Sequence, residues 1–112
     1  MKNNSENYLE RIPVINSEIN WSIDENSIVT LEIENKGITN RLFQKLFKKP
    51  KISYIHLDEL GSFVWQLIDG TKSITELAAD VKKHFGDKAE PLYERLAQYF
   101  QILNSYKFID FK

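Results

Sequence analysis

The stretch that decides the fold is LDELGSFVWQLIDGTKSITELAADV, residues 57–81, because two amphipathic segments meet in it with a short turn between them. The first segment follows a candidate cap at Asp58 and places apolar residues at helical spacing. Gly61 inside it costs about 1 kcal/mol relative to alanine, which indicates a close packing contact with another backbone. Ser73 and Glu76 form an S-x-x-E capping box ahead of the second segment. The stretch predicts helices over 58–69 and 73–85, a pair typical of a helix-turn-helix.

Outward from this stretch, the pattern changes to period two on the N-terminal side. Residues 19–23, 29–34 and 51–57 alternate apolar and polar side chains, which predicts three half-buried strands. The residues before them, 13–18, are interpreted as irregular or extended. On the C-terminal side, Pro91 opens a third helix that runs to about Ser105, and YKFIDF is a candidate short strand.

A basic insertion separates the second and third predicted strands. Apolar residues from Ile38 to Phe47 fall on one face of a short helix over 37–50, which Thr39 can cap and Pro50 ends. Residues 36–51 hold six of the fifteen basic residues and no acidic one. The predicted fold class is therefore α+β and winged helix-turn-helix-like: a small three-stranded antiparallel sheet packed on a three-helix bundle, with an extra short helix between strands two and three. We expect residues 1–18 to form a flexible or extended N-terminal segment and 19–112 to form a single domain.

Composition narrows the function classes. The chain has 112 residues, a net charge of −1 and no cysteine, so disulfides, thiolate metal sites and a cysteine nucleophile are excluded. His56 and His84 lack the spacing of metal ligands, and there is no glycine-rich phosphate loop. No apolar run approaches the length of a transmembrane helix, and the polar N-terminus is unlike a secretory signal. We expect no catalysis, no cofactor and no metal, and a cytoplasmic location.

The third predicted helix has more apolar surface than a core requires. At about 100° per residue, Leu92, Leu96, Tyr99 and Leu103 form a stripe that is expected to face the core. A flank beside this stripe is formed by Tyr93, Ala97, Phe100 and Asn104. Two interpretations stay open: the flank packs under the sheet or the basic helix, or it forms a groove that holds an extended peptide against an edge strand.

The order and spacing of these motifs resemble the PqqD-like family, named for the chaperone of pyrroloquinoline quinone biosynthesis. The resemblance covers about residues 19–112 and rests on Leu57, Asp58-Glu59, Gly61, Trp65, Asp69-Gly70, the apolar spacing Ile74-Leu77-Ala78-Val81, and a last helix that leads into Phe108-Ile109.

This resemblance implies a precursor-peptide recognition element. Members of the family bind the leader region of a precursor peptide as an added β-strand and present it to a modifying enzyme, often a radical S-adenosylmethionine enzyme. Carried over to this chain, it implies backbone contacts along the third strand and a groove on the third helix. The implied peptide-binding residues are Lys51, Ile52, Ser53, Tyr54, Ile55, His56, Tyr93, Ala97, Phe100 and Asn104.

Other functions compete with this interpretation. A winged-helix regulator could clamp DNA phosphates with the basic segment 41–51, although neither candidate reading helix carries a basic stripe and nucleic acid is not the expected partner. The segment RLFQKLFKK could instead lie on a partner protein or an anionic membrane, although packing on the domain's own core is favoured and no membrane partner is expected. The insertion could also cover the sheet edge, dock the enzyme or contact acidic leader residues, and a free edge would permit a dimer.

Overall fold

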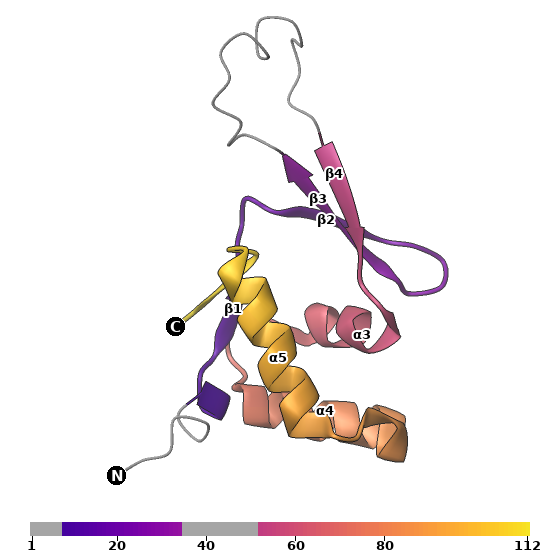
Figure 1. Cartoon of the computed structure of the whole chain (residues 1–112), viewed down its shortest axis with the longest axis vertical. Coiled ribbons are helices and arrows are strands. Elements are labelled where there is room, and N and C mark those ends of the chain that lie inside the picture. Colours follow the sequence, from indigo (N-terminus) through magenta and orange to yellow (C-terminus); the bar gives the residue numbers. More distant parts are fainter. Residues whose placement is uncertain (1–7, 35–51) are drawn as a thin grey trace, which may run out of the picture.

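Two antiparallel sheets and three α-helices make up the part of the chain that the structure describes. The structure is a computed structural model, and it describes residues 8–34 and 52–112. The short helix expected over 37–50 and the predicted contact Lys51 lie outside these ranges. The elements are β1 (Pro13–Ile15), β2 (Asn20–Ile23), β3 (Val29–Glu34), β4 (Ile52–His56), α3 (Glu59–Leu67), α4 (Ile74–Phe85), the 3-10 helix η1 (Gly86–Ala89), α5 (Leu92–Ser105) and β5 (Ile109–Phe111), and Figure 1 labels all of them except η1 and β5.

The three period-two segments form one antiparallel sheet in the order β2-β3-β4, which confirms that part of the sequence prediction. Trp21, Leu31 and Ile55 lie opposite one another across the three strands. This register puts apolar residues on the face toward the helices. Tyr54 and His56 lie on the other face with Glu32 and Thr30.

A second sheet joins the two ends of the described chain. β1 pairs with β5 in the register Pro13↔Phe111 and Ile15↔Ile109. Residues just before β1 also attach to α4, because Arg11 O accepts a hydrogen bond from Ile74 N at 3.0 Å. The sequence predicted a short strand over YKFIDF and an irregular or extended stretch over 13–18, but not the pairing of the two.

The caps at the helix starts follow the sequence prediction. Asp58 is the N-cap of α3 and its carboxylate accepts from Gly61 N at 2.7 Å. Both hydrogen bonds of the capping box at α4 are present between Ser73 and Glu76. Pro91 is the N-cap residue of α5, one position before its first turn. α3 ends at Leu67 and α4 begins at Ile74, so only residues 68–73 connect the two helices.

One buried hydroxyl joins the sheet to the helices. Ser62 of α3 is fully buried, and its Oγ accepts from Val29 N at 2.9 Å while donating to Leu57 O at 3.3 Å. Leu57 N donates to Val29 O at 2.9 Å, so the hydroxyl replaces the other half of this last pair of ladder bonds. The core around it includes Val29, Leu31, Val64, Trp65, Leu77, Leu96 and Phe100, all with no exposed surface.

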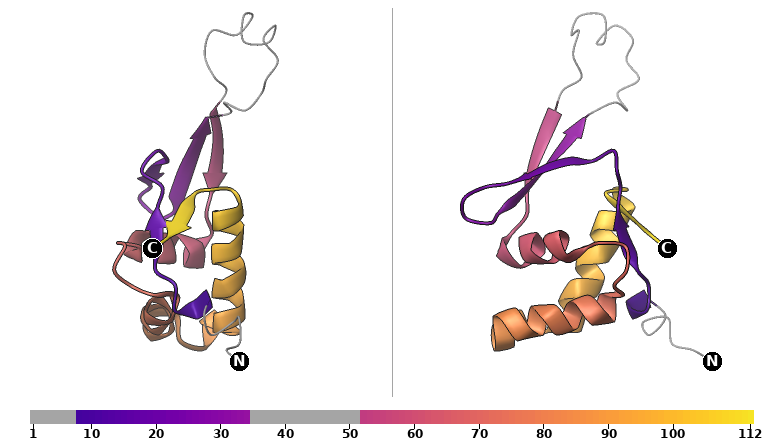
Figure 2. Two further views of the ribbon diagram at one scale, coloured as in Figure 1. Left: turned by 90° about the vertical axis from the view of Figure 1, so that its left-hand side faces the viewer. Right: turned by 180° about the vertical axis from the view of Figure 1, so that it is seen from behind.

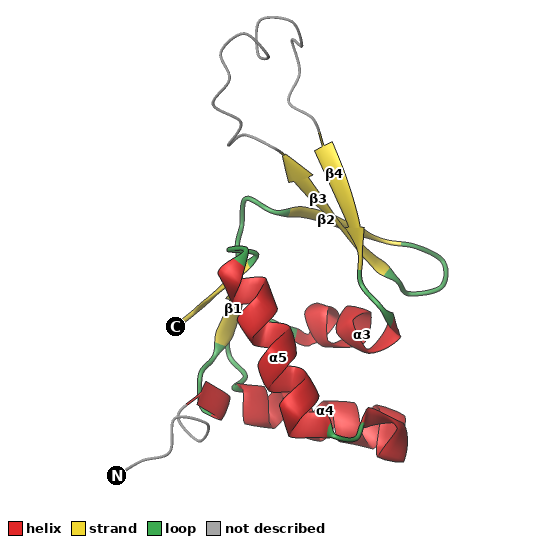
Figure 3. Cartoon of the chain, viewed as in Figure 1, coloured by secondary structure: helices red, strands yellow, loops and turns green. Residues whose placement is uncertain are grey.

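The helices and the three-stranded sheet occupy opposite ends of the molecule, as Figure 3 shows. α5 has α3 and β4 on one side and β1 with the C-terminal strand on the other, in both Figure 1 and the view from behind in Figure 2. The C-terminal end of α5 is the end nearer the sheet. This placement gives α5 two different lateral faces, and only one of them is directed toward β4.

Candidate functional site

The outer edge of β4 is the first component of the site. In the described residues β4 is an edge strand of its sheet, with β3 as its neighbour. Leu57 N donates to Val29 O, and backbone direction alternates along a strand, so the backbone groups of Ser53 and Ile55 also point toward β3. The backbone N–H and C=O groups of Ile52, Tyr54 and His56 therefore point outward. An extended peptide can pair with this second set of groups.

The side chains of β4 give this edge a partly apolar surface. Ile52, Tyr54 and Ile55 are exposed to 42%, 59% and 38%. His56 is held by a hydrogen bond of 2.7 Å between its Nδ1 and Thr30 Oγ1 on β3. Ile55 faces the helices, whereas Ile52 and Tyr54 face away from them. A strand added beside β4 would thus meet apolar side chains on both faces of the sheet.

Tyr99 connects α5 to the corner where β4 enters α3. Its hydroxyl donates to Gly61 O at 2.8 Å. Burial and, second, the negative charge of Asp58 raise the pKa of Tyr99 well above its ordinary value, so the phenol stays a hydrogen-bond donor. A Cβ at Gly61 would lie 3.1 Å from the Tyr99 ring and 2.8 Å from Asp58 Oδ1. The close contact predicted at Gly61 is therefore made with two side chains, and not with another backbone.

The face of α5 that carries Tyr99 runs along the helix. It includes Arg95 before Tyr99 and Ile102 and Tyr106 after it. Their spacings of three and four residues place these side chains on one helical face. Ile102 and Tyr106 are exposed to 48% and 66%, and Arg95 is half-buried. We call Arg95, Tyr99, Ile102 and Tyr106 the Tyr99 face. It is directed toward α3 and β4 because Tyr99 contacts the start of α3.

The flank predicted on α5 lies on a different side of the helix from the Tyr99 face. Asn104 is about 140° around the helix from Tyr99 and lines a hollow with Asn16, Lys107, Ile109 and Asp110, beside β1 and β5. Tyr93 and Ala97 share the side of Asn104, with Tyr93 52% exposed and Ala97 half-buried.

Phe100 has no exposed surface and belongs to the core, in the position that the helical periodicity gave to Tyr99. The structure therefore does not bring the four predicted groove residues together with β4. The sequence did contain one indication of the other face, since Ile102 widened the apolar surface on the side away from the predicted flank.

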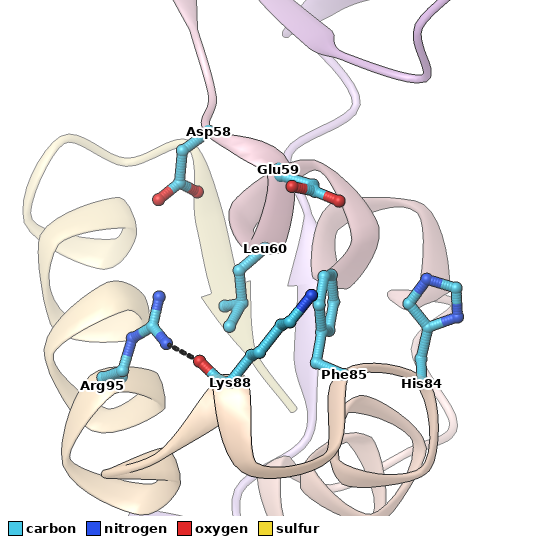
Figure 4. A pocket seen from close by; sticks show the side chains of 7 residues that line it. All are labelled: Asp58, Glu59, Leu60, His84, Phe85, Lys88 and Arg95. Carbon is cyan, nitrogen blue, oxygen red and sulfur yellow. Dashed lines mark hydrogen bonds between the residues drawn. The ribbon is translucent and has the colours of Figure 1, made fainter.

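A hollow continues from the Tyr99 face beneath the start of α3. It has a volume of about 350 Å³ and is lined by Asp58, Glu59, Leu60, His84, Phe85, Lys88 and Arg95. Figure 4 shows the two carboxylates on one side and Lys88 with Arg95 on the other, with Leu60 between them. Arg95 Nη1 donates to Lys88 O at 3.0 Å, which holds the end of η1 against α5.

The described residues offer no metal-ligand cluster of three or more His, Asp or Glu side chains. His84 stacks on Phe63 with ring centroids 4.4 Å apart. No helix in the described ranges is long and apolar enough to span a bilayer.

Comparison with known proteins identifies the family. No curated protein and no solved structure matches the chain. The family model of coenzyme PQQ synthesis protein D (PqqD) matches residues 39–109, a range that includes β4, α3, α4 and α5, the elements of the site described above. The chain therefore belongs to the PqqD family.

Proposed function

We propose that this protein is a non-catalytic adaptor that binds the leader region of a ribosomal precursor peptide and presents it to a separate peptide-modifying enzyme. The observation that carries the proposal is the outer edge of β4, which lies on the same side of α5 as the Tyr99 face. Membership of the PqqD family supports a role in the biosynthesis of pyrroloquinoline quinone or a related peptide product. The resemblance to recognition elements supports a radical S-adenosylmethionine enzyme as the partner and a winged-helix-like domain in the cytoplasm.

The peptide binds as a fourth strand in this proposal. Its backbone pairs with the outward groups of Ile52, Tyr54 and His56, and every second side chain points to the helix side of the sheet. There it meets Ile55 and the exposed Ile102 of the Tyr99 face. Each backbone hydrogen bond contributes only about 0.5–1.5 kcal/mol net, so these apolar contacts supply much of the specificity.

The revised groove differs from the one expected at first. Asn104 lines the hollow beside β1 and β5, and helix geometry puts Tyr93 and Ala97 on the same side of α5. Phe100 is buried in the core. Tyr99, Ile102 and Tyr106 take their place as proposed contacts. Ile52, Tyr54, Ile55 and His56 are retained.

Two proline substitutions test the strand pairing. Tyr54→Pro removes an outward N–H and puts a ring where the peptide backbone would approach, while the bonds to β3 stay intact. Ile55→Pro removes an inward N–H and is the matched control for sheet stability. The assay titrates each protein with short peptides encoded beside its gene, following amide shifts in residues 52–57 and α5 and measuring the melting temperature.

We expect Tyr54→Pro to weaken peptide binding more than about tenfold with little change in melting temperature, which corresponds to about 1.4 kcal/mol of binding free energy. Ile55→Pro should lower the melting temperature clearly. Unchanged peptide affinity in a folded Tyr54→Pro protein would overturn pairing at this edge.

A further inference from the structure

We propose that the hollow beneath the start of α3 is an anion subsite of the peptide groove, which takes an acidic side chain of the bound leader. The inference rests on the proposed function and adds the class of peptide that the site selects. It starts from the position of Arg95, which lies one turn before Tyr99 on the same face of α5 and lines the hollow with Lys88. A peptide that follows the Tyr99 face away from the sheet therefore enters this hollow.

The two cations in the hollow have no carboxylate partner. The ion pairs among the described residues are Lys72–Asp80, Lys82–Asp87 and Lys82–Glu90, so neither Arg95 nor Lys88 takes part in one. Arg95 uses its Nη1 for Lys88 O, which leaves further guanidinium N–H donors available. It also lies in the first turn of α5, where the helix dipole adds positive potential.

The two acids on the opposite side of the hollow are stabilised by the start of α3. Asp58 caps α3 and accepts from Gly61 N at 2.7 Å. Glu59 lies in the first turn of the same helix, where the dipole favours a negative charge. Figure 4 places these carboxylates across the hollow from the cations. Each carboxylate thus lies at the favourable end of α3, whereas neither cation has an ion-pair partner among the described residues, so an incoming carboxylate finds two unpaired cations.

Helix geometry sets the spacing in the peptide. Ile102 and Arg95 are seven residues apart on α5, which is about 10 Å at a rise of about 1.5 Å per residue. An extended chain covers this distance in about three residues at about 3.3 Å each. The proposed leader therefore carries an acidic residue within about two to four residues of the apolar residue that contacts Ile102.

The test selects peptides without assuming their sequence. A phage-displayed library of random peptides, about 16 residues long, is panned on the full chain, and enriched peptides are synthesised and titrated by fluorescence anisotropy. We expect an apolar residue and an acidic residue at the spacing above. Replacing that acid by lysine should weaken binding about tenfold, and Arg95→Glu should reverse this preference.

Three protein variants separate the subsite from general charge effects. Arg95→Glu and Lys88→Glu should each weaken binding of the acidic peptides about five- to tenfold. Lys83→Glu makes the same charge change on exposed α4 outside the hollow and should stay within about twofold. Lys88→Glu keeps the test decisive should loss of the Arg95 hydrogen bond unfold the chain, because no side-chain bond of Lys88 is lost.

The outcomes distinguish the two proposals. The subsite is overturned, and the adaptor proposal left intact, by either of two results. In the first, the enriched peptides bind at β4 but carry no acid at a fixed spacing. In the second, they bind Lys88→Glu and Lys83→Glu equally well. Enrichment of basic residues at that position overturns the charge argument. Failure to enrich any peptide overturns both.

Discussion

Replacing Gly61 by alanine sets two effects against each other at the corner where α3 meets α5. Alanine inside a helix is favoured over glycine by about 1 kcal/mol. Its Cβ would lie 2.8 Å from Asp58 Oδ1 and 3.1 Å from Tyr99 Cε1, so both side chains must move. The first movement weakens the N-cap of α3, and the second breaks the hydrogen bond from Tyr99 to Gly61 O.

These losses exceed the helix gain. An N-cap contributes about 1 kcal/mol, and a buried neutral hydrogen bond contributes about 0.5–1.5 kcal/mol. Together they cost about 2 kcal/mol, so Gly61→Ala should lower the free energy of unfolding by about 1 kcal/mol, or the melting temperature by about 4 °C. Urea denaturation measures this change.

A double-mutant cycle with Tyr99→Phe identifies the cause. If the alanine displaces the tyrosine, removing the hydroxyl costs less in the Gly61→Ala background, and the two changes couple by about 0.5–1 kcal/mol. An increase in stability of about 1 kcal/mol on Gly61→Ala, with additive effects in the cycle, would show that helix propensity dominates and refute the reasoning.

Three further predictions concern the groove and its support. Ile102→Glu should weaken peptide binding at least tenfold, because burying an isoleucine contributes about 1.5–3 kcal/mol. Tyr93→Glu, on the other side of α5, should leave peptide binding unchanged. Equal losses of affinity in titrations of the two variants would contradict the revised groove. The pKa of Tyr99 is raised above its unfolded value of about 10, so its contribution to stability is full below pH 10 and is lost as pH rises further. Between about pH 10 and 12, the melting temperature should therefore fall less steeply with pH in Tyr99→Phe than in the unchanged protein. Equal slopes in the two proteins would argue against this. Ser62→Ala leaves the buried Val29 N–H without its partner and should lower the free energy of unfolding by about 1–3 kcal/mol in urea denaturation. Ser105→Ala, at an exposed hydroxyl, should lower it by under about 0.5 kcal/mol. Similar values for the two variants would refute the bridging role of Ser62.

Local signals in the sequence predicted the local structure well. The capping box at Ser73 and the cap at Asp58 depend on side chains within three residues of the helix start, so their pattern is sufficient. The alternation in 19–34 and 52–57 likewise fixes which face of the sheet is apolar. The pairing of β1 with β5 joins segments of three residues from the two ends of the chain, and such short strands carry no local sign of their partner.

The face of α5 that meets the start of α3 could not be predicted from periodicity. Tyr99 and Phe100 are neighbours in sequence, and both fit an apolar stripe. Phe100 is fully buried, whereas Tyr99 turns its hydroxyl to Gly61. This choice follows from the position of α3 beside α5, which helix angles alone do not contain.

The short outward edge of β4 has a kinetic consequence. Only Ile52, Tyr54 and His56 direct backbone groups outward over the described part of the strand. Their hydrogen bonds contribute about 0.5–1.5 kcal/mol each, against about 4–15 kcal/mol that association costs in lost freedom of motion. For the proposed adaptor, a micromolar complex with its peptide that forms at about 10⁶ M⁻¹s⁻¹ would dissociate about once per second. So brief a residence time would release the peptide readily, and handover would need no separate ejection step.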